Sequence, residues 1–103
     1  MRFIATLTHS PGACWTRTEQ KGKAGEWIAG IDHRAAEHGV ELLGAYVTPT
    51  EHTFYIIVEA DDYEDVTCFL GPPLLHDHDG HIAPILTLRE SAAAFEDRTR
   101  VAN

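Results

Sequence analysis

The stretch FYIIVEADDYEDV, residues 54–66, passes from a strand into a helix and decides the fold. Its β-branched and aromatic residues favour a strand, whose successive side chains point to opposite faces. Both faces of this strand are apolar, with Phe54, Ile56 and Val58 on one and Tyr55 and Ile57 on the other. Asp61 or Asp62 is a suitable N-cap for the helix that follows. The sequence therefore predicts a sheet that needs cover on both sides.

Strands and helices alternate on either side of this stretch. The first helix becomes regular at Ala24, where apolar residues begin to recur at helical spacing, and Gly39 ends it. Gly71, followed by two prolines, is expected to end the second helix. In chain order the sequence predicts a strand over 2–9, a helix over 24–38, strands over 40–48 and 53–60, a helix between Asp61 and Gly71, and a strand over 82–90.

This order, βαββαβ, is that of a ferredoxin-like domain. We expect an α+β fold with a four-stranded antiparallel sheet in the order 4-1-3-2 and both helices on one face. The domain is expected to span residues 1–90, and residues 91–103 to form a C-terminal tail or a short helix. Two helices cover only one face of the sheet, so the other face is expected to dimerise with a second copy by two-fold symmetry.

Composition limits the classes of function. With 103 residues, of which 44% are hydrophobic and 23% charged, the chain has the size of one globular domain. A net charge of −8, from 8 basic and 16 acidic residues, argues against a nucleic-acid partner, whose phosphates need clustered Lys and Arg. No apolar run approaches the roughly 20 residues of a membrane-spanning helix, so we expect no membrane association. Cys14 and Cys68 form no CxxC pair, and together these features predict a cytoplasmic protein.

The chain length, the element order and the stretch 54–66 resemble the dimeric α/β-barrel superfamily, over about residues 2–90. Within that superfamily the chain is similar to small uncharacterised GYD-type domains and, more distantly, to antibiotic-biosynthesis-type monooxygenases and muconolactone isomerase. The residues EHTFY, 51–55, stand near the place of the Gly-Tyr-Asp triplet that names the first group. The resemblance implies a homodimer. It also suggests cofactor-free oxygenation or isomerisation of a small organic substrate, without supplying a set of catalytic residues.

The stretch LLHDHDGHIAP, residues 74–84, holds three of the seven histidines. In the expected topology this stretch meets the end of the first strand and the hairpin between the second and third strands at one end of the sheet. Side chains that can bind a metal ion gather there: His9, His52, His76, His78, His81 and Asp77. Neutral imidazoles bind Zn, Ni, Cu or Fe, and a carboxylate can add a ligand or orient one. His33 and His38 fall on the first helix, away from this end.

Other interpretations of the same residues stay open. The stretch 74–84 is also typical of a solvated polar turn, because Asp and Gly favour turns. His9 or His52 has a side chain suited to act as an acid or base on an organic substrate. Cys14, just beyond the first strand, is a metal ligand, a thiol of lowered pKa or a packing residue.

Four aromatic residues, Trp27, Tyr46, Tyr55 and Phe69, either line a pocket for an aromatic ligand or belong to the core and the dimer contact. The sequence thus leaves three functions. The first is a homodimer that binds a transition metal or a small ligand, the second is a cofactor-free enzyme, and the third is a regulatory or interaction module without catalysis.

Overall fold

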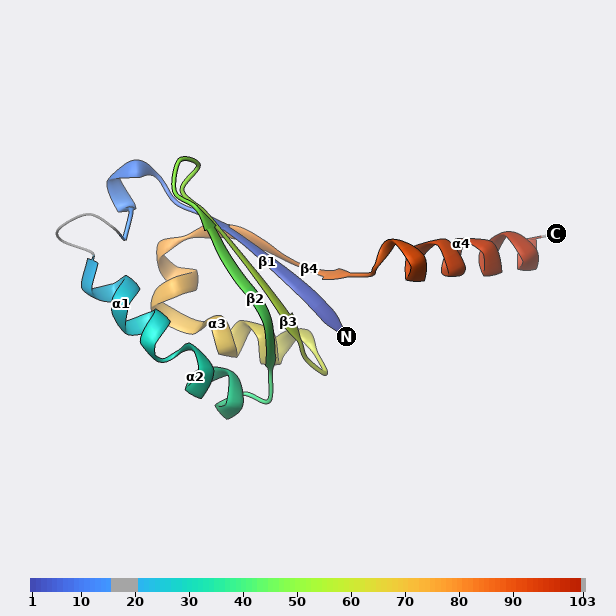
Figure 1. The fold of residues 1–103 in the computed structure, drawn as a ribbon, viewed down its shortest axis with the longest axis horizontal. Coiled ribbons are helices and arrows are strands. Elements are labelled where there is room, and N and C mark those ends of the chain that lie inside the picture. The colour runs from blue at the N-terminus through green and yellow to red at the C-terminus, as the bar shows by residue number, and fades with distance from the viewer. Residues whose placement is uncertain (16–20, 103) are drawn as a thin grey trace.

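The computed structural model describes residues 1–15 and 21–102 and shows an α+β fold with one four-stranded sheet (Figure 1). Its elements in chain order are β1 (Arg2–Thr8), the 3-10 turn η1 (Pro11–Ala13), α1 (Lys21–Ala29), α2 (Ile31–Glu37), β2 (Glu41–Thr48), β3 (Thr53–Glu59), α3 (Tyr63–Asp77), β4 (Asp79–Ile85) and α4 (Leu88–Ala102). Helices α1, α2 and α3 cover one face of the sheet, and α4 extends away beyond the end of β4 (Figure 1). The molecule is accordingly elongated, with extents of 59 × 30 × 18 Å. None of the helices in the described part of the chain is both long and apolar enough to cross a membrane.

The sheet is antiparallel in the order β2-β3-β1-β4, which confirms the strand order predicted from the sequence. The register places Thr8 of β1 opposite both Thr53 of β3 and Asp79 of β4. Thr48 of β2 also lies opposite Thr53. We name this end of the sheet the histidine end, because His9 follows Thr8 directly.

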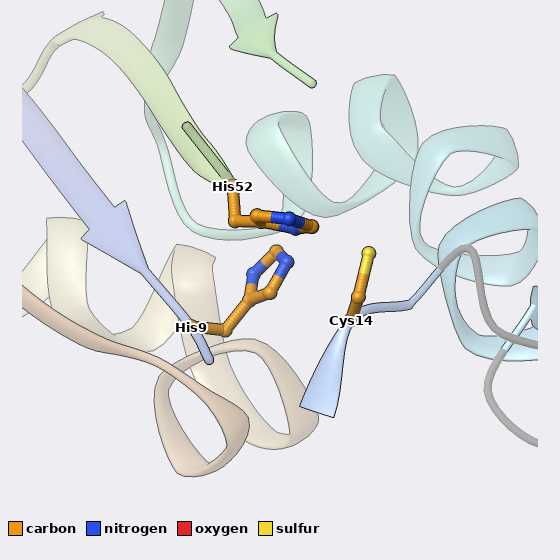
Figure 2. A group of neighbouring side chains, drawn as sticks. All are labelled: His9, Cys14 and His52. Carbon is orange, nitrogen blue, oxygen red and sulfur yellow. The ribbon is translucent and has the colours of Figure 1, made fainter. Parts of the chain in front are cut away.

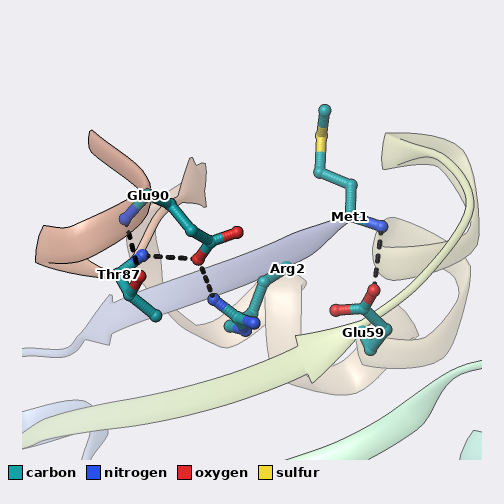
Figure 3. A network of polar contacts seen from close by, with 5 residues as sticks. All are labelled: Met1, Arg2, Glu59, Thr87 and Glu90. Carbon is teal, nitrogen blue, oxygen red and sulfur yellow. Dashed lines mark hydrogen bonds and ion pairs between the residues drawn. The ribbon is translucent and has the colours of Figure 1, made fainter. Parts of the chain in front are cut away.

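The other end of the sheet is held by contacts of the N-terminus. Arg2 lies opposite Glu59 of β3 and Ile85 of β4. The amino group of Met1 donates to Glu59 Oε1 at 3.1 Å and to the Ala60 carbonyl at 2.9 Å, and the first of these contacts is drawn in Figure 3. We name this the Arg2 end.

The core lies between the covered face of the sheet and helices α1, α2 and α3. Its buried residues are Phe3, Ala5, Leu7, Trp15, Trp27, Ala35, Val40, Ile56, Val58, Ala60, Val66, Phe69, Leu70 and Leu74. Trp27 is held there by a hydrogen bond from its Nε1 to the Leu70 carbonyl at 3.3 Å and by the ring of Phe69, whose centroid is 5.9 Å away. Truncation of a fully buried residue such as Leu74 to Ala costs about 2–5 kcal/mol.

The single helix predicted over 24–38 is divided into α1 and α2 at Gly30 (φ −96°, ψ 4°). A glycine inside a helix costs about 1 kcal/mol relative to alanine, which explains the break. The Gly30 amide still donates to the Glu26 carbonyl at 3.1 Å, and the Arg34 amide donates to the Gly30 carbonyl at 2.9 Å. The two helices thus remain hydrogen-bonded across the break, and Gly39 (φ 67°) follows the end of α2 as predicted.

The second predicted helix does not end at Gly71. It begins as expected at Asp62, whose side chain accepts a hydrogen bond from the Asp65 amide at 2.9 Å. Gly71 (φ 52°, ψ 177°) and Pro72 (φ −75°, ψ 146°) leave the helical conformation, but the helix resumes and continues to Asp77. Proline is tolerated at the start of a helical segment, because the N–H that it lacks would have no partner there. The loop expected between this helix and the last strand is therefore wrong, because residues 74–77 belong to α3 and residues 79–81 to β4.

The strand predicted over 82–90 is shifted, since β4 begins at Asp79 and ends at Ile85, and the helix expected in the tail begins earlier, at Leu88. The reason is a capping box in the first turn of α4. The Glu90 amide donates to Thr87 Oγ1 at 3.0 Å, and the Thr87 amide donates to Glu90 Oε1 at 2.8 Å (Figure 3). Arg2 Nη1 donates to the same carboxylate oxygen at 3.1 Å. These bonds end the strand and fix the start of α4 at the Arg2 end.

Candidate functional site

Two histidines and a cysteine meet at the histidine end of the sheet (Figure 2). His9 follows β1, His52 lies in the hairpin before β3, and Cys14 follows η1. Each offers one ligand atom, an imidazole nitrogen or the thiol sulfur, and these three atoms lie within 4.8 Å of one another. Cys14 is buried and both histidines are half-buried. Imidazole and thiolate are ligands that zinc and copper prefer, so the group could hold a metal ion.

Backbone hydrogen bonds bring these three residues together. The His9 amide donates to the His52 carbonyl at 3.3 Å, which continues the pairing of β1 with β3 beyond the strands themselves. The turn η1 is closed by a bond from the Ala13 amide to the Ser10 carbonyl at 3.0 Å. This turn redirects the chain so that Cys14 points toward the two imidazole rings (Figure 2).

His52 has a φ of 51° and is the one residue other than glycine with a positive φ in the described part of the chain. This conformation costs most residues roughly 1–2 kcal/mol, although histidine adopts it more often than most. Residues held in such conformations cluster at functional sites. The positive φ of His52 is therefore energetically unfavourable, but it places the His52 ring against the His9 ring, with centroids 5.2 Å apart.

The residue after Cys14 anchors this segment to α3. Trp15 is 2% exposed, and its Nε1 donates to Asp77 Oδ2 at 3.0 Å. Lys23 Nζ donates to the same oxygen at 2.9 Å. The hydrogen bonds from Lys23 and Trp15 hold the pKa of the Asp77 carboxyl below its usual value. Asp77, a candidate ligand in the sequence, thus positions Trp15 and is not part of the group of three.

His78 packs beside this group without belonging to it. Its ring is buried against those of His9, Trp15 and Phe54, with centroids 4.8, 5.1 and 5.1 Å away. Its Nδ1 lies 2.7 Å from the Leu74 carbonyl oxygen. A carbonyl oxygen only accepts, so Nδ1 carries the proton and Nε2 is the basic nitrogen. Burial lowers the pKa of His78, against the opposing effect of the bond to Leu74.

Buried polar atoms without a partner are concentrated here. Among the described residues, four buried side-chain nitrogen or oxygen atoms lack a hydrogen-bond partner: both ring nitrogens of His9, Nε2 of His78 and Oγ1 of Thr48. All four belong to the histidine end, and each costs about 1–3 kcal/mol when left unpaired. Burial, and then the charges of His78 and His52, lower the pKa of His9. The His9 ring is therefore neutral near pH 7, with a lone pair available for a ligand.

The remaining histidines of the predicted cluster lie elsewhere. His76 is exposed near the end of α3 and, with His38, lines a hollow of about 440 Å³. His81 is exposed on β4 opposite Thr6, on the face that α1, α2 and α3 leave open. The three histidines of the stretch 74–84 point in different directions because His76 lies in α3, His78 lies between the two elements, and His81 lies in β4.

An apolar cavity of about 300 Å³ adjoins the group. The residues that line it are Trp15, Ala24, Trp27, Ile28, Ile31, Leu42, Ala45, Tyr46, Val47, Phe54 and Ile56. Of the aromatic residues that the sequence assigned to a pocket, Trp27 and Tyr46 belong to this lining. Phe69 is fully buried against Trp27, and Tyr55, which alternates with the buried Ile56, faces the open side of the sheet.

The sequence placed Cys14 at this end of the sheet but did not include it in the ligand set, and it did not single out Trp15 or Lys23. Their relation to His9 depends on the path of η1 and on a contact with the end of α3. No local sequence pattern predicts either the path of η1 or this contact with α3. The one usable signal was proximity along the chain, because so short a segment after His9 cannot leave this end of the sheet.

The structure thus defines a small α+β domain, compatible with a ferredoxin-like fold, that carries a His-Cys-His group at one end of its sheet. A family model described as a domain of unknown function, DUF3303, matches residues 1–98, and the chain belongs to this family. No curated protein and no solved structure matches the chain. The family match does not itself place the chain in the dimeric α/β-barrel superfamily, which stays a prediction.

Proposed function

We propose that this chain binds a transition metal ion through His9, Cys14 and His52. The observation that carries the proposal is their arrangement, with three ligand atoms within 4.8 Å at a place where both His9 ring nitrogens are buried without a partner. A metal ion accepts the lone pair of an imidazole nitrogen and so offsets the cost of burying it. Two imidazoles and a thiolate suit ions of Zn, Ni, Cu or Fe better than Mg²⁺ or Ca²⁺, which prefer oxygen ligands.

Small movements of the side chains complete the geometry. Zinc binds nitrogen at about 2.0–2.1 Å and sulfur at about 2.3 Å, so tetrahedral ligand atoms lie roughly 3.3–3.6 Å apart. The limit of 4.8 Å among the three atoms exceeds this by about 1 Å, which rotation of a side chain in the surface hairpin of His52 can supply. Three protein ligands leave a fourth position, which in catalytic zinc sites holds water or substrate.

The surroundings suit metal binding as well. A ligand must be deprotonated, and the lowered pKa of His9 keeps its ring neutral near pH 7. Residues that orient metal ligands matter almost as much as the ligands themselves. Here the bond from Trp15 to Asp77 fixes the segment that carries Cys14, and the His78 ring packs on His9.

Titration with Co²⁺ tests the proposal, because thiolate ligation gives cobalt an intense charge-transfer band in the near ultraviolet. We expect Co²⁺ to produce this band in protein purified without an affinity tag, and excess Zn²⁺ to abolish it. Cys14→Ser removes the band, and His52→Ala weakens Co²⁺ binding by about tenfold or more. His33→Ala changes an exposed histidine of α2 and leaves binding unaltered. A cobalt spectrum without the thiolate band, or one that Cys14→Ser does not alter, contradicts the proposal.

We further propose that the open face of the sheet binds a second copy of the chain. Helices α1, α2 and α3 cover the other face (Figure 1), and Ile4, Tyr55 and Ile57 of the open face are half-buried rather than enclosed. A copy related by a two-fold axis covers such a face with an identical one. We expect sedimentation velocity to give a dimer, and Ile57→Lys to give a monomer that keeps the Co²⁺ band. A native chain that sediments as a monomer contradicts this.

A second candidate function is cofactor-free oxygenation or isomerisation of a small organic substrate. The observation that favours it is the apolar cavity, whose lining residue Phe54 lies against the neutral His9 ring at a centroid distance of 5.8 Å. His9 or His52 acts as the base in this case. Turnover then survives removal of metal by a chelator and is lost in His9→Phe. Binding of neither metal nor substrate would leave the interaction module as the remaining alternative.

A further inference from the structure

We infer that the cavity beside the His-Cys-His group binds a flat, uncharged aromatic molecule. Its volume of about 300 Å³ lies at the lower end of the range of small-molecule sites. None of the described residues that line it carries a charge. Two lining indole N–H groups are already used, because Trp15 donates to Asp77 and Trp27 donates to the Leu70 carbonyl. Tyr46 borders the cavity, but its ring lies over Gly44 on the open face of the sheet, opposite Tyr55. A charged ligand would therefore lose its hydration in the cavity without gaining a partner among the side chains that line it.

The walls of the cavity are aromatic and held in place. Trp27 is buried on Phe69, and Trp15 meets Phe54 edge to face, with centroids 6.3 Å apart and planes at 62°. Aromatic rings pair favourably with further rings in offset or edge-to-face arrangements. Walls that are already fixed lose little freedom when a ligand binds. The small side chain of Ala45 on β2 leaves the space between them open.

Apolar side chains remain exposed at the mouth of the cavity. Ile28 of α1 and Val47 of β2 are 66% and 51% exposed. Grouped apolar exposure of this kind marks a binding site. A small aromatic molecule covers these side chains and also fills the volume behind them. Behind this rim lies a volume of about 300 Å³, which is the size of a small-molecule site, so a small aromatic molecule is the occupant that we propose.

The cavity and the proposed metal site share a wall. Phe54 lines the cavity and lies 5.8 Å from the His9 ring centroid, and Trp15 lines it and directly follows Cys14 in the chain. A metal ion bound by His9 and Cys14 therefore touches the cavity wall through two neighbours, the His9 ring packed on Phe54 and the residue that precedes Trp15. Coupling between two sites is reciprocal, so we expect metal binding and aromatic binding to strengthen each other. This coupling rests on the proposed function, whereas binding in the cavity does not.

A pair of dyes tests the cavity in metal-free protein. N-phenyl-1-naphthylamine is uncharged and fluoresces in apolar surroundings, and 1-anilinonaphthalene-8-sulfonate has the same rings with a negative charge. We expect the uncharged dye to bind with one site per chain and the sulfonate to bind about tenfold more weakly or worse, because its charge finds no partner. Equal affinity for the two dyes overturns the inference.

Filling the cavity is the matched test. Ala45→Phe places a ring in the cavity, and β2 tolerates the change because aromatic residues favour strands. We expect this variant to bind the uncharged dye about tenfold more weakly or worse. Ala36→Phe makes the same change at an exposed position of α2 and leaves affinity unaltered. Circular dichroism and cooperative unfolding verify that both variants fold. Unchanged dye binding in Ala45→Phe overturns the inference. Loss of the dimer in that variant would show that a second copy of the chain occupies the cavity, which also contradicts the inference.

The coupling has its own readout. We expect Zn²⁺ to tighten binding of the uncharged dye about fivefold or more in the native chain and to have no effect in Cys14→Ser. A chain that gives the Co²⁺ band but binds dye independently of Zn²⁺ overturns the coupling. A chain that binds dye but gives no Co²⁺ band refutes the metal proposal and retains the cavity site.

Discussion

The two ends of the sheet differ in whether their polar groups have hydrogen-bond partners. At the Arg2 end the N-terminal amino group pairs with Glu59, and the Glu90 carboxylate accepts bonds from Arg2 and the Thr87 amide (Figure 3). At the histidine end, where His9 lies beside His52 and Cys14 (Figure 2), both ring nitrogens of His9 are buried without a partner. The first end is surface-exposed and satisfied, whereas the second is partly buried and unsatisfied.

This difference separates groups that hold the fold from groups that are available for binding. Exposed ion pairs add little to stability, but a buried unpaired atom costs about 1–3 kcal/mol. Proteins keep such costs mainly where function requires them. Ligands should therefore change stability through the histidine end. Acid acts at both ends, because the pKa values of Asp77, His9 and His78 are lowered as well as that of Glu90.

Removal of the unpaired imidazole should have the largest effect. At a free Zn²⁺ concentration 100 times the Kd, binding to the folded state alone adds about 2.7 kcal/mol to the free energy of unfolding. His9→Phe loses this gain, and its metal-free form is at least as stable as the native chain, because a phenyl ring needs no hydrogen bond. Urea denaturation with and without Zn²⁺ measures both quantities. A metal-free His9→Phe chain that is less stable than the native one would show that the His9 nitrogens have partners in solution.

His52→Gly separates the hairpin from the site. Glycine adopts a positive φ without steric cost, so this change should raise the free energy of unfolding of the metal-free chain by up to about 1 kcal/mol. The same variant loses the stabilisation by Zn²⁺. His52→Ala lacks the ring but keeps the steric cost, so it should be the less stable of the two in thermal denaturation. Equal stabilities would mean that residue 52 does not hold this conformation in solution.

Asp77→Ala tests whether the anchor of Trp15 serves the site. Loss of the bonds from Trp15 and Lys23 frees the segment that carries Cys14, so affinity for Co²⁺ should fall about tenfold while the thiolate band persists. Asp79→Ala, at an exposed position at the start of β4, is the control and should leave affinity unchanged. Equal losses of Co²⁺ affinity in the two variants would show that Asp77 acts only through its charge and not by positioning Trp15.

The sheet could be predicted from the sequence, but two of its connections could not. Alternation around Ile56 and the element order were enough to give the strand order. Gly71 and Pro72 are local helix stops, yet burial of Leu74 in the core favours a second helical segment beyond them. The residues Thr87 to Glu90 carry the T-x-x-E pattern of a capping box, but the apolar run before them favoured a longer strand.

The candidate site was predictable only where it depends on strand ends. His9 and His52 flank paired strands, so the topology places them together, and the structure does so. The directions of His76 and His81 depend on whether each lies in a helix or a strand, and the sequence predicted a loop for both. The position of the Cys14 side chain depends on the path of η1, and the sequence of this turn has no periodic pattern. Hydrophobic periodicity thus predicts where strands begin and end. The direction of a side chain beyond a strand end depends on the tertiary structure.

The smallest effect is expected at the Arg2 end. The bond from the Thr87 amide, and then those from Arg2 and the Thr87 hydroxyl, lower the pKa of Glu90 from 4.5 to about 2. The folded state thus favours the carboxylate, so its contribution is complete above about pH 4.5 and is lost as the pH falls toward 2. Glutamine also serves in a capping box, so Glu90→Gln removes the charge and keeps the cap.

We expect the helical circular dichroism signal of the native chain to fall between pH 4.5 and 2 by more than that of Glu90→Gln, because α4 loses its charged anchor to Arg2 over this range. Affinity for Co²⁺ near pH 7 should be the same in both chains, since the ligands lie at the opposite end of the sheet. A Glu90→Gln chain with altered Co²⁺ affinity would show that the two ends are coupled, and that the division of the sheet into a stabilising end and a binding end does not hold.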